Sequence, residues 1–561
     1  MKFLHNHVGY ALTAPKRALL QCSPGFGGGR FSLVNADTRE LLLGAELRPL
    51  GGVARWRDWQ FWEADFSAVQ APARCFISLD GATPPVVSHT FTLAPRVLDR
   101  PLLSDLLHYF KGQRCTGIFD AADHACPIFG SDERVDVHGG WYDASGDVSK
   151  YLSHLSYANF LNPQQTPQLV WNLIDGRSRL GAQPLWFDER MVDEALHGAD
   201  YLLRLQHPSG YFHMTVFDRW SKDVAQRRVC SYTTQQGHMF STTQAAFRQG
   251  GGSTIAALAR ASQLPRDGEA PREAYLAAAE RGFAHLQAHN REYLPDGQEN
   301  TIDDYCALLA ACELVAATGA PAYGDAAEAR AARLVARQHE EGWFWADDAA
   351  TRSYVHAAEA GLPCVALARF LELMPRSAVA PRVRDALVRA WRHQLALAAP
   401  GEGNPFGYPR QWVQQPGRAP RAQFFMPHDN DSGYWWQGEN ARLASIASAA
   451  LATLPHLQDP ALRSGLAALA QQATDWILGF NPFDACMMQG QGHNPPQYEP
   501  GYFNAPGGVC NGITACLHDE EDIDFRMPQD TDMSQSWRWS EQWLPHGAWL
   551  FLATAHAIGA G

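Results

Sequence analysis

The feature that most restricts the fold is a helical spacing of apolar residues that recurs from about Leu102 to the end of the chain. Between Tyr305 and Ala316, apolar side chains recur at this spacing within an alanine-rich stretch, as in an amphipathic helix. Comparable patterns, including one over 149–160, predict roughly a dozen helices in sequence. No repeat of about 33–45 residues is visible, which disfavours helical-repeat arrays. The sequence therefore predicts an all-α region, either a closed helical toroid or an open superhelix.

The first 97 residues follow a different period. Short apolar runs are separated by Gly, Pro and Asp clusters, and His89–Leu93 alternates polar and apolar side chains, as a half-buried strand does. The full length of 561 residues also exceeds one ordinary compact core. We therefore predict a multidomain chain, with a small β-sandwich over 1–97 followed by the all-α region over 98–561.

Charge, apolar segments and cysteines narrow the class of protein. The net charge of −13 argues against a nucleic-acid partner, because phosphate binding requires clustered Lys and Arg. No apolar run is long enough to cross a bilayer, and the N-terminus lacks the pattern of a secretory signal. The eleven cysteines include no CxxC pair, which favours reduced thiols. These features predict a cytoplasmic protein without a membrane or nucleic-acid partner, and they indicate no oligomeric state.

Three long stretches interrupt the helical pattern, at about 130–148, 399–437 and 479–540. They are rich in Gly, Pro, Asn, aromatic and acidic residues. Long loops are uncommon in compact domains and often carry functional residues. Because the candidate site residues fall in or beside these stretches, we favour an enzyme over a scaffold.

The segment from His138 to Asp147 reads His-Gly-Gly-Trp-Tyr-Asp-Ala-Ser-Gly-Asp. Its carboxyl groups, Asp143 and Asp147, lie four residues apart around a Ser-Gly turn, close enough to share one water or one substrate hydroxyl. Trp141 and Tyr142 have flat apolar faces of the kind that pack against sugar rings. An Asx turn at Asp143 and a helix cap at Asp147 explain the spacing equally well.

This segment, with Lys150 and Tyr151 after it, resembles the GGWYDAGD-x-x-K-[FY] signature of glycoside hydrolase family 9. The resemblance runs nearly the whole length of the chain. It implies an (α/α)6 barrel preceded by an immunoglobulin-like domain. The other segments that resemble the family are His7–Tyr10, Pro15–Ala18, Phe110–Cys115, Gly250–Ala259 and Gly479–Pro482.

The resemblance implies three catalytic residues. Asp147 matches the general base, and Asp143 matches the Asp that helps to hold the attacking water. Glu541, just before the last apolar helix, matches the general acid; the alternative is a first-turn Glu favoured by the helix dipole. An apolar wall would raise the pKa of this carboxyl, and three tryptophans lie beside it: Trp537, Trp539 and Trp543.

Further residues are candidates for substrate binding. The block from His428 to Asn440 combines acids with stacked aromatic side chains, although a solvated loop with core aromatics explains each of them equally well. His493 matches a family His that binds substrate, but a structural role is the more common one for a single His. The predicted set is Trp141, Tyr142, Asp429, Asp431, Trp435, Trp436, Glu439, His493 and Trp539.

Two departures from the family resemble its exo-β-D-glucosaminidase subgroup. Ser145 adds a residue between the two aspartates, and the Arg that usually follows the family His is missing. The cationic substrate of this subgroup would need a nearby carboxylate, from Asp143, Asp429, Asp431 or Glu439. We therefore predict an inverting glycoside hydrolase that releases glucosamine from the non-reducing end of β-1,4-linked chito-oligosaccharides. The alternatives are a β-1,4-glucanase or cellodextrin hydrolase of the same family, and a non-catalytic carbohydrate-binding protein.

No cofactor is expected, and a short oligosaccharide is the expected partner. Some relatives carry structural calcium, for which the acidic run His518–Asp522 is the candidate site, although a solvated acidic run is the favoured interpretation. Zinc is not expected, because no Cys/His set has the spacing of zinc ligands.

Overall fold

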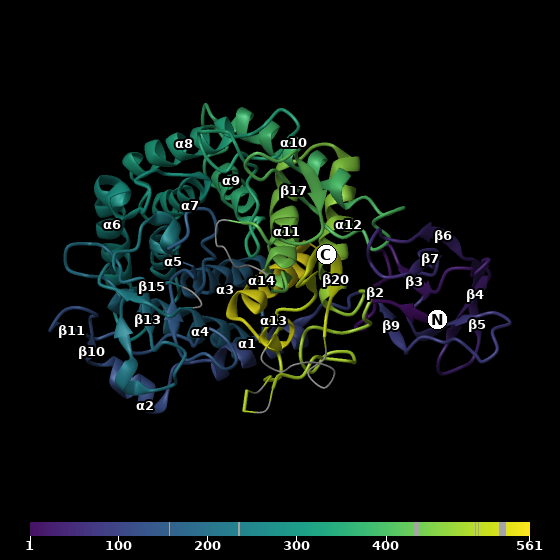
Figure 1. Ribbon diagram of the computed structural model, residues 1–561. Helices are drawn as coiled ribbons and strands as arrows, with labels where there is room; N and C mark the ends of the chain where they lie inside the picture. The colour runs from purple at the N-terminus through teal and green to yellow at the C-terminus, as the bar shows by residue number, and fades with distance from the viewer. Residues whose placement is uncertain are drawn as a thin grey trace.

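The chain folds into a strand-rich N-terminal region beside a larger helical body (Figure 1). The computed structural model describes residues 1–155, 157–233, 236–430, 437–499, 501–502, 504–526 and 535–560. Within these residues there are fourteen α-helices, and no helix is both long and apolar enough to span a membrane.

Nine strands build the N-terminal region. They are β1 (Lys2–Leu4), β2 (Tyr10–Ala11), β3 (Arg17–Cys22), β4 (Arg30–Asn35), β5 (Leu41–Glu46), β6 (Arg48–Gly51), β7 (Gln60–Asp65), β8 (Ala73–Leu79) and β9 (Phe91–Ala94). One sheet has the order β1-β3-β7-β6, and the other has the order β2-β9-β8-β4-β5.

Alternating side chains along these strands fill a core that both sheets share. In β9, Phe91 and Leu93 are buried and Thr92 between them is exposed. The strand begins two residues later than the predicted His89–Leu93 but keeps the predicted alternation. Leu20 from β3 of the other sheet belongs to the same buried cluster. A strand-rich region at this end of the chain is confirmed.

Six helices of the helical body contact one another in a closed ring. In order these are α3 (Thr166–Leu180), α5 (Gly251–Ala261), α7 (Thr301–Thr318), α9 (Leu362–Leu373), α11 (Asn440–Thr453) and α14 (Leu544–Ala560), and α14 packs back against α3. Six more helices pack outside them: α1 (Arg100–Gly112), α4 (Leu185–Arg204), α6 (Arg272–His289), α8 (Pro321–Ala336), α10 (Ala380–Ala398) and α12 (Pro460–Ile477). Of the two predicted arrangements, the closed one is therefore correct.

Two local predictions in this region are wrong. The described residues of the stretch over 149–160 form no helix, and Lys150 and Tyr151 form the short strand β12, which pairs with β13 (Thr215–Phe217). The helix α7 is not amphipathic, since its first fourteen residues are all buried. A helix of the inner ring is surrounded by protein, so it has no polar face to show in its sequence.

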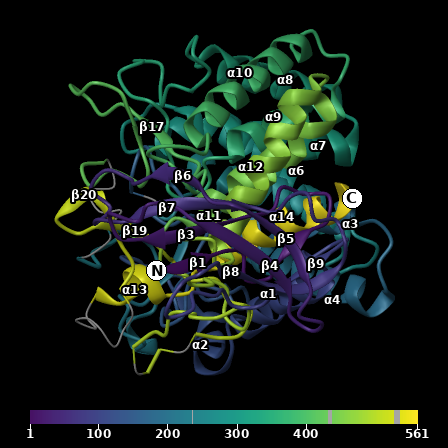
Figure 2. The same cartoon turned by 90° about the vertical axis from the view of Figure 1, so that its right-hand side faces the viewer.

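The N-terminal strands make a wide contact with the helical body, and Figure 2 shows them in front of it. The Arg17 guanidinium on β3 donates hydrogen bonds to the carbonyl oxygens of Pro405 and Phe406, at 3.0 and 2.6 Å. Trp56 is fully buried and packs against Phe424. Apolar side chains of both regions form one continuous cluster, so the contact is mainly hydrophobic with a polar contribution from Arg17.

Asp475 on α12 is a buried carboxyl at this contact, and we expect it to lower stability at high pH. It accepts a hydrogen bond of 2.6 Å from Asn6, and burial raises its pKa to about 7. A carboxyl whose pKa is raised by folding destabilises the fold as the pH rises from about 4 through 7. We expect Asp475→Asn to raise the free energy of unfolding by up to about 4 kcal/mol at pH 8, and by little at pH 4. Thermal melts at both pH values measure the difference, and equal gains at the two would contradict this origin.

Candidate active site

The turn that carries Asp143 and Asp147 is fixed by the backbone and by a glycine. The Asp143 N–H donates to the carbonyl oxygen of Ser149 at 3.0 Å. Gly146 has a φ of +103°, and a Cβ there would collide with the ring of Tyr502. A side chain at this position would therefore disturb the turn, and both carboxyl groups it carries are buried.

Asp143 accepts hydrogen bonds from residues just before two inner helices. Gln165 precedes α3 and donates its side-chain amide, and Trp543 precedes α14 and donates its indole N–H at 2.9 Å. Burial, together with the nearby Asp147 carboxyl, raises the pKa of Asp143 well above its usual range. Asp143 is therefore a carboxyl that readily holds a proton.

Asp147 accepts hydrogen bonds from its own side of the turn. The donors are the Ser149 N–H at 2.8 Å and the Tyr151 hydroxyl at 3.2 Å. Burial raises the pKa of Asp147, and the Ser149 N–H opposes that rise. The carboxyls of Asp143 and Asp147 lie within hydrogen-bonding reach of each other, so they titrate as a pair that takes up its first negative charge more readily than its second. We place that charge mainly on Asp147, because the pKa of Asp143 is raised further.

Glu541 lies half-buried just before α14. The Asn511 side-chain amide approaches its Oε2 at 3.4 Å, and the Tyr498 hydroxyl lies within hydrogen-bonding reach. Burial raises the pKa of Glu541 well above its usual range, and the charges of Asp143 and Asp147 add to the rise. Such a carboxyl holds its proton to a higher pH than an exposed glutamate and can donate it to a leaving group.

The two segments that carry these carboxyls pair directly with each other. Ala144 and Trp543 form an antiparallel bridge, and the Ser145 N–H donates to the Gln542 carbonyl at 2.8 Å. Gln542 directly follows Glu541, which brings the three predicted catalytic residues into one site. The site combines one carboxyl of raised pKa with a carboxyl pair that shares a charge, the two kinds of group that general acid and base catalysis use.

Two tryptophans predicted to bind sugar, Trp141 and Trp539, are core residues. Trp141 is fully buried and donates its indole N–H to Glu194 at 2.7 Å. Trp539 is also buried. Tyr142 is half-buried, and its hydroxyl exchanges hydrogen bonds with the backbone of Thr116. We therefore remove Trp141 and Trp539 from the sugar-binding set, since neither ring has a free face.

Two predicted carboxylates are already paired. Glu439 is buried, forms a 2.5 Å ion pair with Arg442, and accepts a hydrogen bond from the Met426 N–H. The Asp429 side chain is largely exposed and forms a 3.2 Å ion pair with Arg418. Neither carboxylate is free to bind a substrate amine without giving up its arginine. The remaining predicted residues, Asp431, Trp435 and Trp436, lie outside the described residues.

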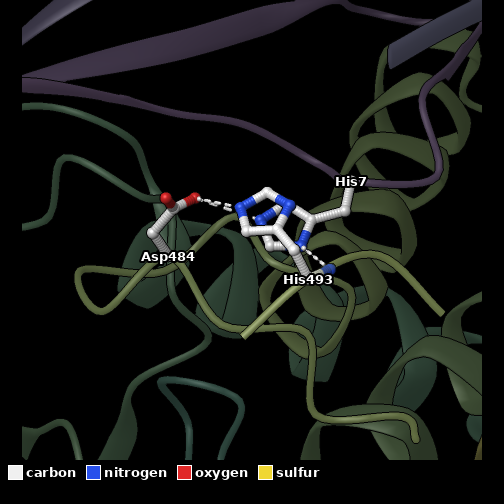
Figure 3. Close-up of side chains that lie close together, drawn as sticks. All are labelled: His7, Asp484 and His493. Atoms are coloured by element: carbon white, nitrogen blue, oxygen red, sulfur yellow. Dashed lines mark hydrogen bonds and ion pairs between the residues drawn. The ribbon is translucent and has the colours of Figure 1, made fainter. Parts of the chain in front are cut away.

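His493 lies at the contact with the N-terminal strands rather than beside the carboxyl groups. Its ring stacks on that of His7, with centroids 3.5 Å apart and an interplanar angle of 16° (Figure 3). Both Nε2 atoms approach the same oxygen of Asp484, at 3.0 and 3.2 Å. We therefore assign His493 to the contact between the two regions.

The cluster of His7, Asp484 and His493 brings three potential metal ligands together, but its geometry suits a hydrogen-bonded cluster better. Both Nε2 atoms converge on one oxygen of Asp484, at 3.0 and 3.2 Å, so the carboxylate already occupies the point between them. The backbone N–H of His493 also donates to Nδ1 of His7 at 3.3 Å, which leaves Nε2 of a neutral His7 protonated. A zinc ligand needs that nitrogen free.

The predicted calcium candidate, the acidic run His518–Asp522, is partly paired with two arginines. Asp519 forms an ion pair with Arg55 of the N-terminal region, and Glu520 forms one with Arg421. These ion pairs account for the acidic run as a part of the protein surface that joins distant segments.

Four residues of the site were not among the predicted site residues: Tyr151, Gln165, Tyr498 and Asn511. Each contacts a catalytic candidate from a different segment of the chain. Tyr151 belongs to the quoted signature, and its spacing from Asp147 was the one available signal. The other three reach the site only through the closed ring of helices.

Comparison with known proteins identifies a family. The family model described as Glycosyl hydrolase family 9 matches residues 100–499. This stretch includes Asp143 and Asp147 and ends before Glu541. Among curated proteins, none matches the chain.

Solved structures share the fold. A metagenome-derived glycoside hydrolase family 9 endoglucanase has a TM-score of 0.69 and 19% identity, over 100% of this chain and 99% of its own. The structure of Bacteroides ovatus GH9 has a TM-score of 0.68 and 18% identity over the same shares. The cellulase Cel9M of C. cellulolyticum has a TM-score of 0.53 and 19% identity, over 82% of this chain and 97% of its own. At these identities the likeness concerns the fold alone.

Proposed function

The chain belongs to glycosyl hydrolase family 9 and is therefore a glycoside hydrolase, and we propose that it cleaves β-1,4 linkages of short oligosaccharides with inversion. Family membership removes the non-catalytic alternative. We infer that the two rings of helices form an (α/α)6 barrel and that the N-terminal strands form an immunoglobulin-like domain. The observation that carries the proposal is the pairing of the segment that holds Asp143 and Asp147 with the segment that holds Glu541.

The proposed reaction is a single displacement. Glu541 donates its proton to the glycosidic oxygen as the bond to the anomeric carbon breaks. Asp147 removes a proton from water, which attacks that carbon from the opposite face, and Asp143 helps to orient the water. An inverting pair requires about 6.5–9.5 Å between acid and base to admit this water. The raised pKa of Glu541 and the charge on the aspartate pair support this division of roles.

A neutral β-1,4-glucan oligosaccharide is our first candidate substrate. Two of the three solved structures named above are an endoglucanase and a cellulase. Two of the carboxylates considered for an amine, Glu439 and Asp429, are paired with arginines. The Lys222 ammonium lies 3.8 Å from the ring centroid of Tyr502, which packs against Gly146 of the catalytic turn. A cation there would repel a positively charged sugar.

Glucosamine at the non-reducing end of a chito-oligosaccharide is the second candidate. The observation in its favour is a third carboxyl, Asp218, close enough to Asp147 to raise its pKa. Asp218 is buried and accepts a 2.9 Å hydrogen bond from the Ser149 hydroxyl. Three neighbouring carboxyls create a negative potential that attracts an ammonium group.

We expect the protein to hydrolyse cellotetraose faster than the tetramer of β-1,4-linked glucosamine. Product chromatography on both substrates at equal concentration decides between the candidates. Cleavage of the amine substrate alone would establish the second candidate and reject the first. Proton NMR of the first turnovers is expected to show the α-anomer, and a β-anomer would contradict inversion.

A further inference from the structure

Ser145 forms two hydrogen bonds with the backbone of Gln542, the residue that follows Glu541. Its N–H donates to the Gln542 carbonyl at 2.8 Å, and its hydroxyl oxygen accepts from the Gln542 N–H at 2.8 Å. In a regular strand pair a backbone carbonyl would accept that second bond. Here the chain turns away at Gly146, and the Ser145 hydroxyl takes the place of the carbonyl.

The same hydroxyl also reaches the residue that precedes Glu541. It donates to the side-chain oxygen of Asn504 at 3.4 Å, and the Asn504 amide donates to the Ser540 carbonyl at 2.9 Å. Ser145 is almost fully buried, with 4% of its surface exposed. One side chain thus contacts both neighbours of Glu541, directly on one side and through Asn504 on the other.

Asp147 has its own supports, whereas Glu541 has few. The Ser149 N–H and the Tyr151 hydroxyl hold the Asp147 carboxylate independently of Ser145. Among the residues that the structure describes, the Glu541 carboxyl has only the long 3.4 Å contact with Asn511 and the approach of the Tyr498 hydroxyl. The placement of Glu541 relative to the base therefore depends on its backbone.

We infer that Ser145 is a positioning residue that sets the place of Glu541 relative to Asp147, through its hydrogen bonds to Gln542 and Asn504. Removal of its hydroxyl leaves the Gln542 N–H without its acceptor. The Asn511 N–H still donates to the Glu541 carbonyl at 2.7 Å, but the acid-bearing segment loses one of its hydrogen bonds to the catalytic turn. A misplacement of about 1 Å costs about 10²-fold in rate. The inference rests on the proposed function, because it assigns acid catalysis to Glu541.

The test compares two leaving groups on the same sugar. An oligosaccharide needs a proton from Glu541 at its leaving oxygen, whereas a dinitrophenyl glycoside departs without one. We expect Ser145→Ala to lower kcat on the oligosaccharide by about 10- to 100-fold, with KM changed less than threefold and the dinitrophenyl rate nearly retained. Ser145→Thr keeps the hydroxyl and is expected to retain much of the wild-type kcat on the oligosaccharide. Ser145→Cys keeps the size but not the hydroxyl and is expected to lose kcat as Ser145→Ala does.

The controls distinguish a failure of the positioning role of Ser145 from a failure of the proposed function. Ser262→Ala removes a hydroxyl at the end of α5 that bonds only a nearby carbonyl and the side chain of Gln263, and we expect it to change neither rate. Should Ser145→Ala fail to fold, the comparison of Ser145→Thr with Ser145→Cys still decides. Equal losses on both substrates, or no loss, would overturn the positioning role. A wild-type protein inactive on both substrates would overturn the proposed function itself.

Discussion

Glu541→Gln is expected to lower kcat/KM on oligosaccharides by about 10²–10⁴-fold, which is the usual contribution of a general acid. Glutamine has nearly the shape of glutamic acid and keeps the contact with Asn511, but it has no proton to give to the leaving oxygen. On a dinitrophenyl glycoside the loss is expected to be less than about tenfold, because that leaving group needs no protonation. Steady-state rates on both substrates measure the effect.

A matched change elsewhere shows that the loss is specific. Glu273 lies exposed in the first turn of α6, and Glu273→Gln is expected to leave both rates unchanged. The raised pKa of Glu541 adds a second readout. The wild-type rate should fall at high pH as Glu541 loses its proton, and the remaining activity of Glu541→Gln should lack this fall. A variant that loses equal activity on both substrates would contradict the acid role.

The sequence predicted the carboxyl groups of the site better than the aromatic residues that would bind the sugar. Asp143 and Asp147 stand in a long signature and Glu541 lies among three tryptophans, and the structure brings the three carboxyl groups together. Trp141 and Trp539 stand in the same motifs, yet both are buried. An aromatic ring serves a core as well as a sugar subsite, so a motif alone does not tell which way the ring faces.

The contacts that take Glu439 and His493 out of the predicted substrate-binding set could be predicted from the sequence only in part. Arg442 follows Glu439 by three residues at the start of α11, a spacing that brings side chains together on a helix. That signal could have predicted the pairing of Glu439. The contact of His493 with His7 joins positions 486 residues apart, and no local pattern predicts it. Gln165 likewise reaches Asp143 only because the ring of helices closes.

Asp147→Ala is expected to lower kcat on every substrate by about 10²–10⁴-fold, including the dinitrophenyl glycoside. The attacking water needs its proton removed whatever the leaving group is, so the loss should not depend on the leaving group. This pattern is the opposite of that expected for Glu541→Gln. Rates of the two variants on the two substrates therefore identify base and acid separately.

Rescue by a small anion tests which aspartate is the base. Azide needs no deprotonation and can enter the space that the Asp147 carboxylate leaves. Attack on the anomeric carbon from the face opposite the leaving group would yield an α-glycosyl azide from a β-linked substrate, with NMR as the readout. Asp143→Ala is expected to gain less from azide, because the pKa of Asp143 is raised further and its carboxyl holds the proton of the pair. Stronger rescue of Asp143→Ala than of Asp147→Ala would reverse the two assignments.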